Sequence, residues 1–127
     1  MITIGKTIYS ILSSTTGVTS IVGTSIYPLI IPEKGTLPCI IFKRGFNNNY
    51  TKDGLNDSDS TIDLTILATD YEKAIDISTA VFNCLNMYRG EANGIHIYAI
   101  HLVGGDEDYT EGAFIQKLNF EVKSSLV

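Results

Sequence analysis

The sequence has few basic residues, two cysteines and no long apolar run. Nine lysines and arginines are outnumbered by fourteen aspartates and glutamates, giving a formal net charge of -5. Nonspecific binding to nucleic acid depends on clustered basic side chains that release counterions from phosphates. Because Lys43-Arg44 is the only adjacent basic pair, the sequence argues against a general DNA- or RNA-binding surface.

Membrane and secretory patterns are also missing. No stretch approaches the roughly 20 apolar residues of a membrane helix, and polar residues interrupt the first twelve positions, so no secretory leader is expected. We therefore expect a protein that is made and kept in the cytoplasm. Cys39 lies in an apolar strand-like run and Cys84 in an amphipathic helix, where free thiols act as small hydrophobic groups, so we expect both to be buried and reduced.

Motifs of catalysis are absent as well, including the Walker loop, the nucleophile elbow, the dinucleotide-binding glycine motif and the zinc-protease helix motif. His96 and His101 are five residues apart on an expected strand, which would place them on opposite faces and prevent a shared metal unless the strand has a bulge. The acidic runs 53–59 and 106–111 carry oxygen ligands but do not fit EF-hand spacing. We predict no cofactor, no metal and no enzymatic activity, while ions that bridge subunits stay possible.

The apolar residues that are present are enough for one domain over residues 1–127, since 44% of the chain is hydrophobic. A first helix is predicted to about Ser14 from an apolar repeat with helical spacing. That repeat comprises Ile4, Ile8, Ile11 and Leu12. Gly17 and Gly23 are expected to break the chain around a short apolar turn at 18–22. An extended segment should follow at 25–31, and it should be an edge strand or lie beside one, because Pro28 cannot donate to a ladder.

Three further stretches complete the first half of the chain. Residues 39–46 are rich in β-forming side chains and predict a strand. The polar stretch 47–60 contains the turn signal Lys52-Asp53-Gly54, so it is either an extended hairpin arm or a mobile loop. Residues 61–68 alternate between apolar and polar side chains and predict a second strand.

A second helix is expected after a capping box, in which Thr69 and Glu72 satisfy each other's backbone amides. Its apolar face should pack on the core. That face comprises Ala74, Ile77, Val81, Leu85 and Tyr88. Tyr71, Ile75 and Phe82 form a further apolar strip, which is either a wide core stripe or a second buried surface.

The second helix should end at 90–94, and two strands should follow at 95–103 and 114–123, separated by an acidic loop at 104–112. The order of elements predicts an α+β fold. We expect a mixed, mostly antiparallel β-sheet with two α-helices packed on one face and an extended β-hairpin arm.

Read end to end, the chain resembles a family of small phage tail-component proteins similar to the tail terminators of long-tailed phages. The resemblance spans nearly the whole chain and depends on the order of short segments. These are Ile11-Leu12-Ser13-Ser14, Ile21-Val22-Gly23-Thr24, Ile26-Tyr27-Pro28-Leu29, Leu37-Pro38 before 40–42, the polar arm, Ala68-Thr69, Tyr71 with Ala74, Gly94-Ile95 and the last strand through Phe120. Lys34-Gly35 and the asparagine-rich arm depart from the pattern, at positions where relatives vary.

The resemblance implies a six-fold ring on the head-proximal end of the tail tube. Such a ring binds the last ring of tail tube protein, stops tube polymerisation and presents a surface to head-completion or neck proteins. DNA would pass through the lumen without specific binding. Six copies at -5 each would carry -30, a field that discourages DNA from adhering. The implied location is the virion neck, after assembly in the host cytoplasm.

A ring closes when one interface between two unlike patches repeats with the right rotation. We predict that the apolar helix strip, the polar arm and the acidic loop supply contacts between subunits or with partners. The predicted interface residues are Tyr50, Lys52, Asp53, Asp57, Asp59, Tyr71, Ile75, Phe82, Asp106, Glu107 and Asp108.

Two alternatives stand beside the tail terminator. The first is another component of the same particle, such as a head-completion, neck or tail-tube protein, which would share the α+β build and the tendency to oligomerise. The second, which the sequence favours less, is a small metal-dependent hydrolase that uses His101 with the acidic residues Asp106, Glu107 and Asp108.

Overall fold

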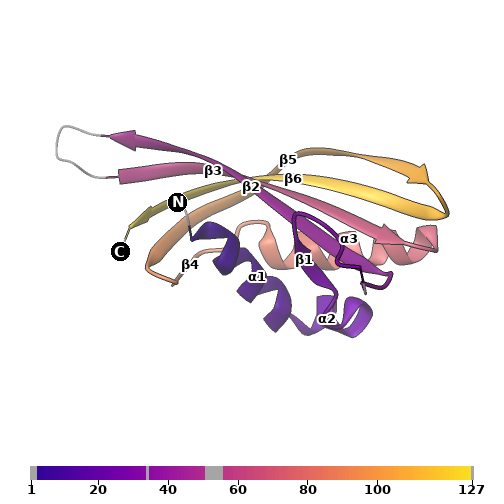
Figure 1. Cartoon of the computed structure of the whole chain (residues 1–127). Helices are drawn as coiled ribbons and strands as arrows, with labels where there is room; N and C mark the ends of the chain where they lie inside the picture. Colours follow the sequence, from indigo (N-terminus) through magenta and orange to yellow (C-terminus); the bar gives the residue numbers. More distant parts are fainter. Residues whose placement is uncertain (1–2, 34, 51–55, 127) are drawn as a thin grey trace.

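The computed structural model describes the backbone of residues 3–33, 35–50 and 56–126, and the side chains of all these residues except 46–50, 56–58 and 126. Within this part of the chain, three helices cover one face of a six-stranded sheet (Figure 1). The helices are α1 (Ile4–Ser14), α2 (Thr16–Val22) and α3 (Tyr71–Leu85). The strands are β1 (Ile26–Pro28), β2 (Cys39–Tyr50), β3 (Asn56–Ala68), β4 (Gly90–Ala92), β5 (Ile95–Thr110) and β6 (Ala113–Leu126). This confirms the predicted α+β class.

The strand order in the sheet is β1-β2-β3-β6-β5-β4. The short strand β1 is parallel to β2, and the other neighbouring pairs are antiparallel. The sheet is therefore mixed and mostly antiparallel, as predicted. β1 lies at an edge, which fits the missing N–H of Pro28.

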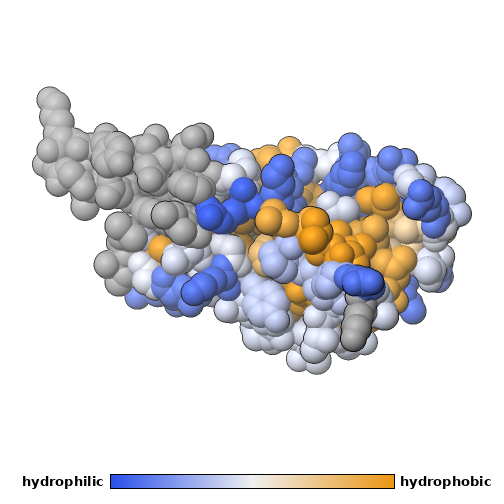
Figure 2. Space-filling view, viewed as in Figure 1, coloured by the Kyte–Doolittle hydropathy of each residue, from blue (hydrophilic) through white to orange (hydrophobic). Residues whose placement is uncertain are grey.

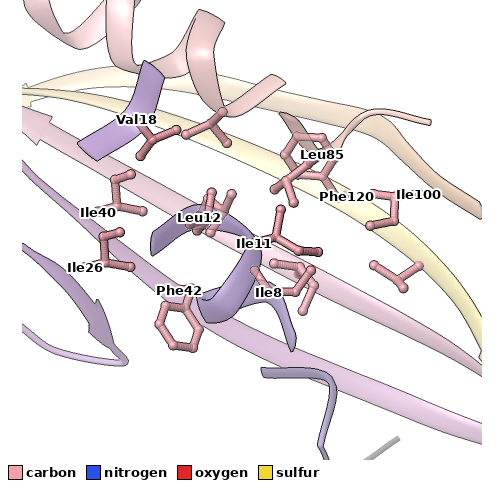
Figure 3. Packing of buried hydrophobic residues seen from close by; sticks show 14 of the residues in the cluster. Ile8, Ile11, Leu12, Val18, Ile26, Ile40, Phe42, Leu85, Ile100 and Phe120 are labelled. Carbon is pink, nitrogen blue, oxygen red and sulfur yellow. The ribbon is translucent and has the colours of Figure 1, made fainter. Parts of the chain in front are cut away.

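The core lies between the helices and the covered face of the sheet. Figure 3 shows Ile8, Ile11 and Leu12 of α1 among side chains from β1, β2, β5 and β6, with Leu85 of α3 beside Phe120. The predicted apolar faces of both long helices are confirmed. On α1, Ile4, Ile8, Ile11 and Leu12 are buried, and on α3, Ala74, Ile77, Val81 and Leu85 are buried. Tyr88 lies after α3 and packs partly buried against the same cluster.

A helix, α2, occupies the segment that the sequence predicted as a turn. Val18 and Val22 are four residues apart, share one helical side and are both buried. Gly17 does not break the chain: it lies inside α2, and a Cβ added there would meet the Ala80 side chain of α3 at 3.9 Å. The break comes only at Gly23, whose φ of 61° suits a residue without a Cβ.

The ends of α3 differ from the prediction. Its N-cap is Asp70, whose carboxylate accepts from the Glu72 amide at 3.2 Å, so the predicted Thr69 capping box is wrong. An aspartate one position nearer the helix satisfies the same orphan amide directly. The helix ends at Leu85 rather than at 90–94, and β4 follows.

The segment 104–112, predicted as an acidic loop, is almost entirely strand. β5 runs on to Thr110, which is paired with Ala113 at the start of β6. Only Glu111 and Gly112 turn, with φ of 52° and 83°. Positive φ at both central residues is the signature of the tight hairpin turn that matches strand twist, so two residues are enough to reverse the chain.

The polar segment 47–60 continues the sheet as a hairpin arm. β2 and β3 remain in register as far as Tyr50 and Asn56, so the arm alternative is the right one for the described residues. Lys52 and Asp53 lie outside them. In Figure 1 this arm and the β5–β6 turn point to opposite ends of the sheet.

Cys39 is fully buried, and burial raises the pKa of its thiol to about 11. Cys84 is half-buried rather than buried, and burial also raises its pKa. Among the described residues, no helix has the length and apolar character needed to cross a membrane.

Candidate functional site

The apolar strip of α3 faces outward on the monomer. Tyr71, Ile75 and Phe82 are 44%, 36% and 37% exposed, whereas Ala74, Ile77 and Val81 of the same helix are fully buried. The strip is therefore not a wide core stripe. Three large apolar side chains of one helix half in water are the kind of surface that marks a contact with another molecule.

Tyr71 joins this strip to the β5–β6 hairpin. Its hydroxyl donates to Glu107 Oε2 at 2.8 Å, and its ring stands edge-on to Phe114 with 5.8 Å between ring centroids. Tyr109 contacts the same Phe114 ring, with 4.8 Å between the two ring centroids. The structure thus brings together Tyr71 and Glu107, two predicted interface residues 36 positions apart in sequence.

The Glu107 carboxylate is held by two donors. Gln116 Nε2 donates to Glu107 Oε2 at 2.8 Å, and Tyr71 donates to the same oxygen. Hydrogen bonds favour the ionised form, so Gln116 first and Tyr71 second lower the pKa of Glu107. The pKa of Tyr71 is raised in turn, mainly by the hydrogen bond to Glu107.

Folding lowers the pKa of Glu107. The stabilisation by its hydrogen bonds to Gln116 and Tyr71 is therefore fully present at pH values above the ordinary pKa of glutamate, and it is lost as the pH falls through the lowered pKa. We expect Gln116→Met to raise the pKa of Glu107 toward the ordinary value, and Tyr71→Phe to raise it less. NMR titration of the Glu107 carboxyl carbon measures both shifts. An unchanged midpoint in both variants would contradict the bonding.

Two adjacent glycines shape the strand that carries these acids. Leu102 and Gly104 flank an irregularity in the β5–β6 register, and a Cβ on Gly105 would clash with the Lys117 carbonyl oxygen. A Cβ on Gly104 would meet nothing within 4 Å. Of the two glycines, only Gly105 is needed for the close approach of β5 to β6 beside Asp106.

We expect Gly105→Ala to destabilise the fold by about 1–3 kcal/mol, the usual range for forced backbone shifts. Gly104→Ala is the matched control and should stay within about 0.5 kcal/mol of the parent, as for open surface positions. Chemical denaturation of the two variants measures both free energies of unfolding. Equal losses would contradict the contact with Lys117 as the cause.

The remaining predicted interface residues lie toward the two ends of the sheet. Asp106 and Asp108 are exposed on β5, and Asp59 is partly buried on β3. Tyr50 and Asp57 belong to the strands of the arm, with side chains outside the described ones. The arm and the β5–β6 turn mark opposite ends of the sheet, so these residues form two separate groups (Figure 1).

The histidines do not lie on opposite faces as predicted. A register shift between Ile97 and Ala99 resets the alternation, so Ile97 and Ile100 both face the core while His96 and His101 both point away from it. Even so, among the described residues no group of three or more His, Cys, Asp or Glu could hold a metal ion. The hypothesis of a metal-dependent hydrolase therefore has no set of metal ligands in this part of the chain.

The sequence did not reveal a groove between α1 and the β1 edge. It has a volume of about 670 Å³. Its lining residues are Gly5, Lys6, Tyr9, Ser10, Ile26, Pro28, Phe42, Arg44 and Asn93. Beyond Pro28 the side chains of Leu29 and Ile30 are exposed, and Figure 2 shows apolar surface over β1 and the segment after it. Three consecutive apolar residues after Pro28 were the available signal.

This architecture matches a solved structure over nearly its whole length. The fold resembles that of a virion chain. The match is to a chain from the virion of a native gene transfer agent (GTA) particle, with a TM-score of 0.77, covering 93% of this chain and 91% of that chain. The two sequences are 14% identical, so the likeness shows a common fold. No protein-family model matches the sequence, and no curated protein matches it.

Proposed function

We propose that this chain is a structural subunit of a phage-like particle, and that it acts as the tail terminator. Six copies form a ring on the head-proximal end of the tail tube, stop tube polymerisation and provide the surface to which head-completion or neck proteins join. The observation that carries the proposal is the match over nearly the whole chain to a chain of the gene transfer agent virion, with a TM-score of 0.77.

The exposed surfaces support an assembling role. A subunit of a closed ring needs two unlike patches, because each copy contacts one neighbour with one patch and the next neighbour with the other. The strip of Tyr71, Ile75 and Phe82 is one half-exposed apolar surface, and the groove beside β1 is a second, formed by different elements. The acidic β5 segment and the polar arm are further candidates for contacts between subunits or with tube or neck proteins.

The test is the state of the purified protein and of particles that lack it. With tail tube protein present, negative-stain images and light scattering should show rings at tube ends; monomers alone would overturn the proposal. Particles made without the chain should carry overlong tails. DNA-filled heads without tails would instead identify a head-completion or neck protein of the same particle. The tube protein must be included, since the ring forms on it.

A further inference from the structure

The two edges of the sheet carry opposite charge. At the β1 edge, Lys6 and Arg44 line the 670 Å³ groove together with Tyr9 and Phe42. A smaller adjoining hollow of about 160 Å³ adds Lys43. No acidic residue lines either hollow among the described residues, so this edge is apolar with a basic rim.

The β5 edge has the opposite character. Beyond Ile97, β5 has no second strand beside it in the described part of the chain, because β4 pairs only with the first three residues of β5. Asp106, Glu107 and Asp108 are exposed along this free stretch, and Tyr109, the next residue, is 57% exposed. Lys117 of β6 is the basic exception, opposite Asp106.

The β1 edge and residues 100–102 of β5 are not suited to adding a strand from another molecule. β1 has three residues and includes Pro28, which lacks an N–H. On β5, the Ile100 carbonyl already accepts from the Met87 amide, and the Leu102 amide donates to the Asn86 side chain. Contact between these edges would therefore be made by side chains, with an apolar centre and charges around it.

We propose that the acidic, aromatic β5 edge of one copy docks against the basic, apolar groove at the β1 edge of a second copy. This contact rests on the proposed ring and supplies one pair of facing surfaces in the interface that repeats around it. Tyr109 enters the groove beside Tyr9 and Phe42, and Asp106 and Asp108 face Lys6 and Arg44. Opposite charges on unlike edges select head-to-tail contact over like-to-like pairing, which would bring acid to acid or base to base.

Charge reversal on each edge separately tests the contact. The groove variant is Lys6→Glu with Arg44→Glu, and the edge variant is Asp106→Lys with Asp108→Lys. The control is Asp63→Lys with Glu121→Lys, on the open face of the central strands β3 and β6. It changes the net charge by the same amount as the edge variant. Each of the two variants also places a new lysine opposite an existing one, which is Lys43 in the control and Lys117 in the edge variant. Thermal melts followed by circular dichroism establish that each variant is folded.

Each reversed variant alone should lose rings, whereas the wild type and the control keep them on tail tube protein, as measured by light scattering and negative stain. A one-to-one mixture of the groove and edge variants should regain rings with alternating copies, because reversed groove then meets reversed edge. Rings from either folded variant alone, or no recovery in the mixture of folded variants, overturn the proposal. Wild-type protein that forms no ring overturns the proposed function itself.

A second measurement tests the same contact if one of the charge-reversed variants does not fold. Charge-paired contacts between exposed groups weaken as salt screens them. Wild-type ring assembly should therefore require higher protein concentration as salt is added. Tyr109→Ser keeps every charge and removes the aromatic side chain, so it should weaken assembly while leaving the salt dependence in place. Assembly that is insensitive to both changes also overturns the contact.

Discussion

Phe82→Asp is expected to abolish ring assembly while the monomer stays folded. Phe82 is 37% exposed on α3, so a charge there reaches water in the free subunit. Burying that charge against an apolar neighbour would cost its hydration. Loss of an aromatic residue at the centre of a contact typically costs about 2–4 kcal/mol, which is roughly 30- to 700-fold in affinity. Light scattering with tail tube protein present measures this loss.

Asn83→Asp is the matched control, because it adds the same charge at the next position, on the exposed polar side of α3. It should leave assembly unchanged. Thermal melts decide the meaning of a negative result. If Phe82→Asp unfolds, Phe82 supports the fold of the monomer. If the variant is folded and still forms rings, the helix strip lies outside the ring contacts.

Phe120→Ala should have the largest effect on the stability of the monomer. Phe120 is fully buried on β6, and Figure 3 places it beside Leu85 of α3. Removing a buried phenyl ring loses its transfer free energy and leaves a cavity that neighbouring side chains fill only in part, at a usual cost of about 3–5 kcal/mol. Urea denaturation at fixed protein concentration measures the change, since assembly adds its own stabilisation.

The control is Ile30→Ala, at a side chain that is exposed in the segment after β1. Such a position should change the free energy of unfolding by no more than about 0.5 kcal/mol. A loss below about 1 kcal/mol for Phe120→Ala would contradict the packing in Figure 3, because it would mean that the site is already open or collapses fully.

Helix faces were predictable because their spacing alone sorts residues into buried and exposed. Ile8 and Leu12 of α1 and Ile77 and Val81 of α3 are buried where the periodicity placed them. The helix α2 was not predicted, because Gly17 reads as a break when its surroundings are unknown. In the folded chain the neighbouring Val18 has a core to pack on, and tertiary packing overrides the propensity.

Two hairpin turns could have been predicted from the sequence but were not. Asn93-Gly94 joins β4 to β5 and Glu111-Gly112 joins β5 to β6, all four residues with positive φ. Asn-Gly is among the strongest short signals for a hairpin, and Glu-Gly is a weaker one because glutamate enters that region less readily. The shift at Tyr98, which turns both histidines outward, has no comparable residue signature.

The candidate site was predictable in its parts but not in its assembly. The sequence identified the apolar strip that contains Tyr71 but left open whether it belongs to the core, and the acidity of 106–108 is plain in the sequence. Their meeting depends on where the β5–β6 hairpin passes the start of α3, which sequence spacing does not encode. The groove has the same origin, since its lining residues Gly5, Pro28 and Arg44 come from α1, β1 and β2.

The strand order places β6, the last strand of the sequence, between β3 and β5. During synthesis both neighbours leave the ribosome before the strand that separates them exists, so the two halves of the sheet then have no strand between them. Pairs such as Asp57 with Ser125 close late and over a long stretch of chain. A partly made chain that lacks β6 therefore has no strand to hold the β1-β2-β3 part of the sheet beside the β5-β4 part, and the two edges of the sheet take their final relation only when the last strand is in place.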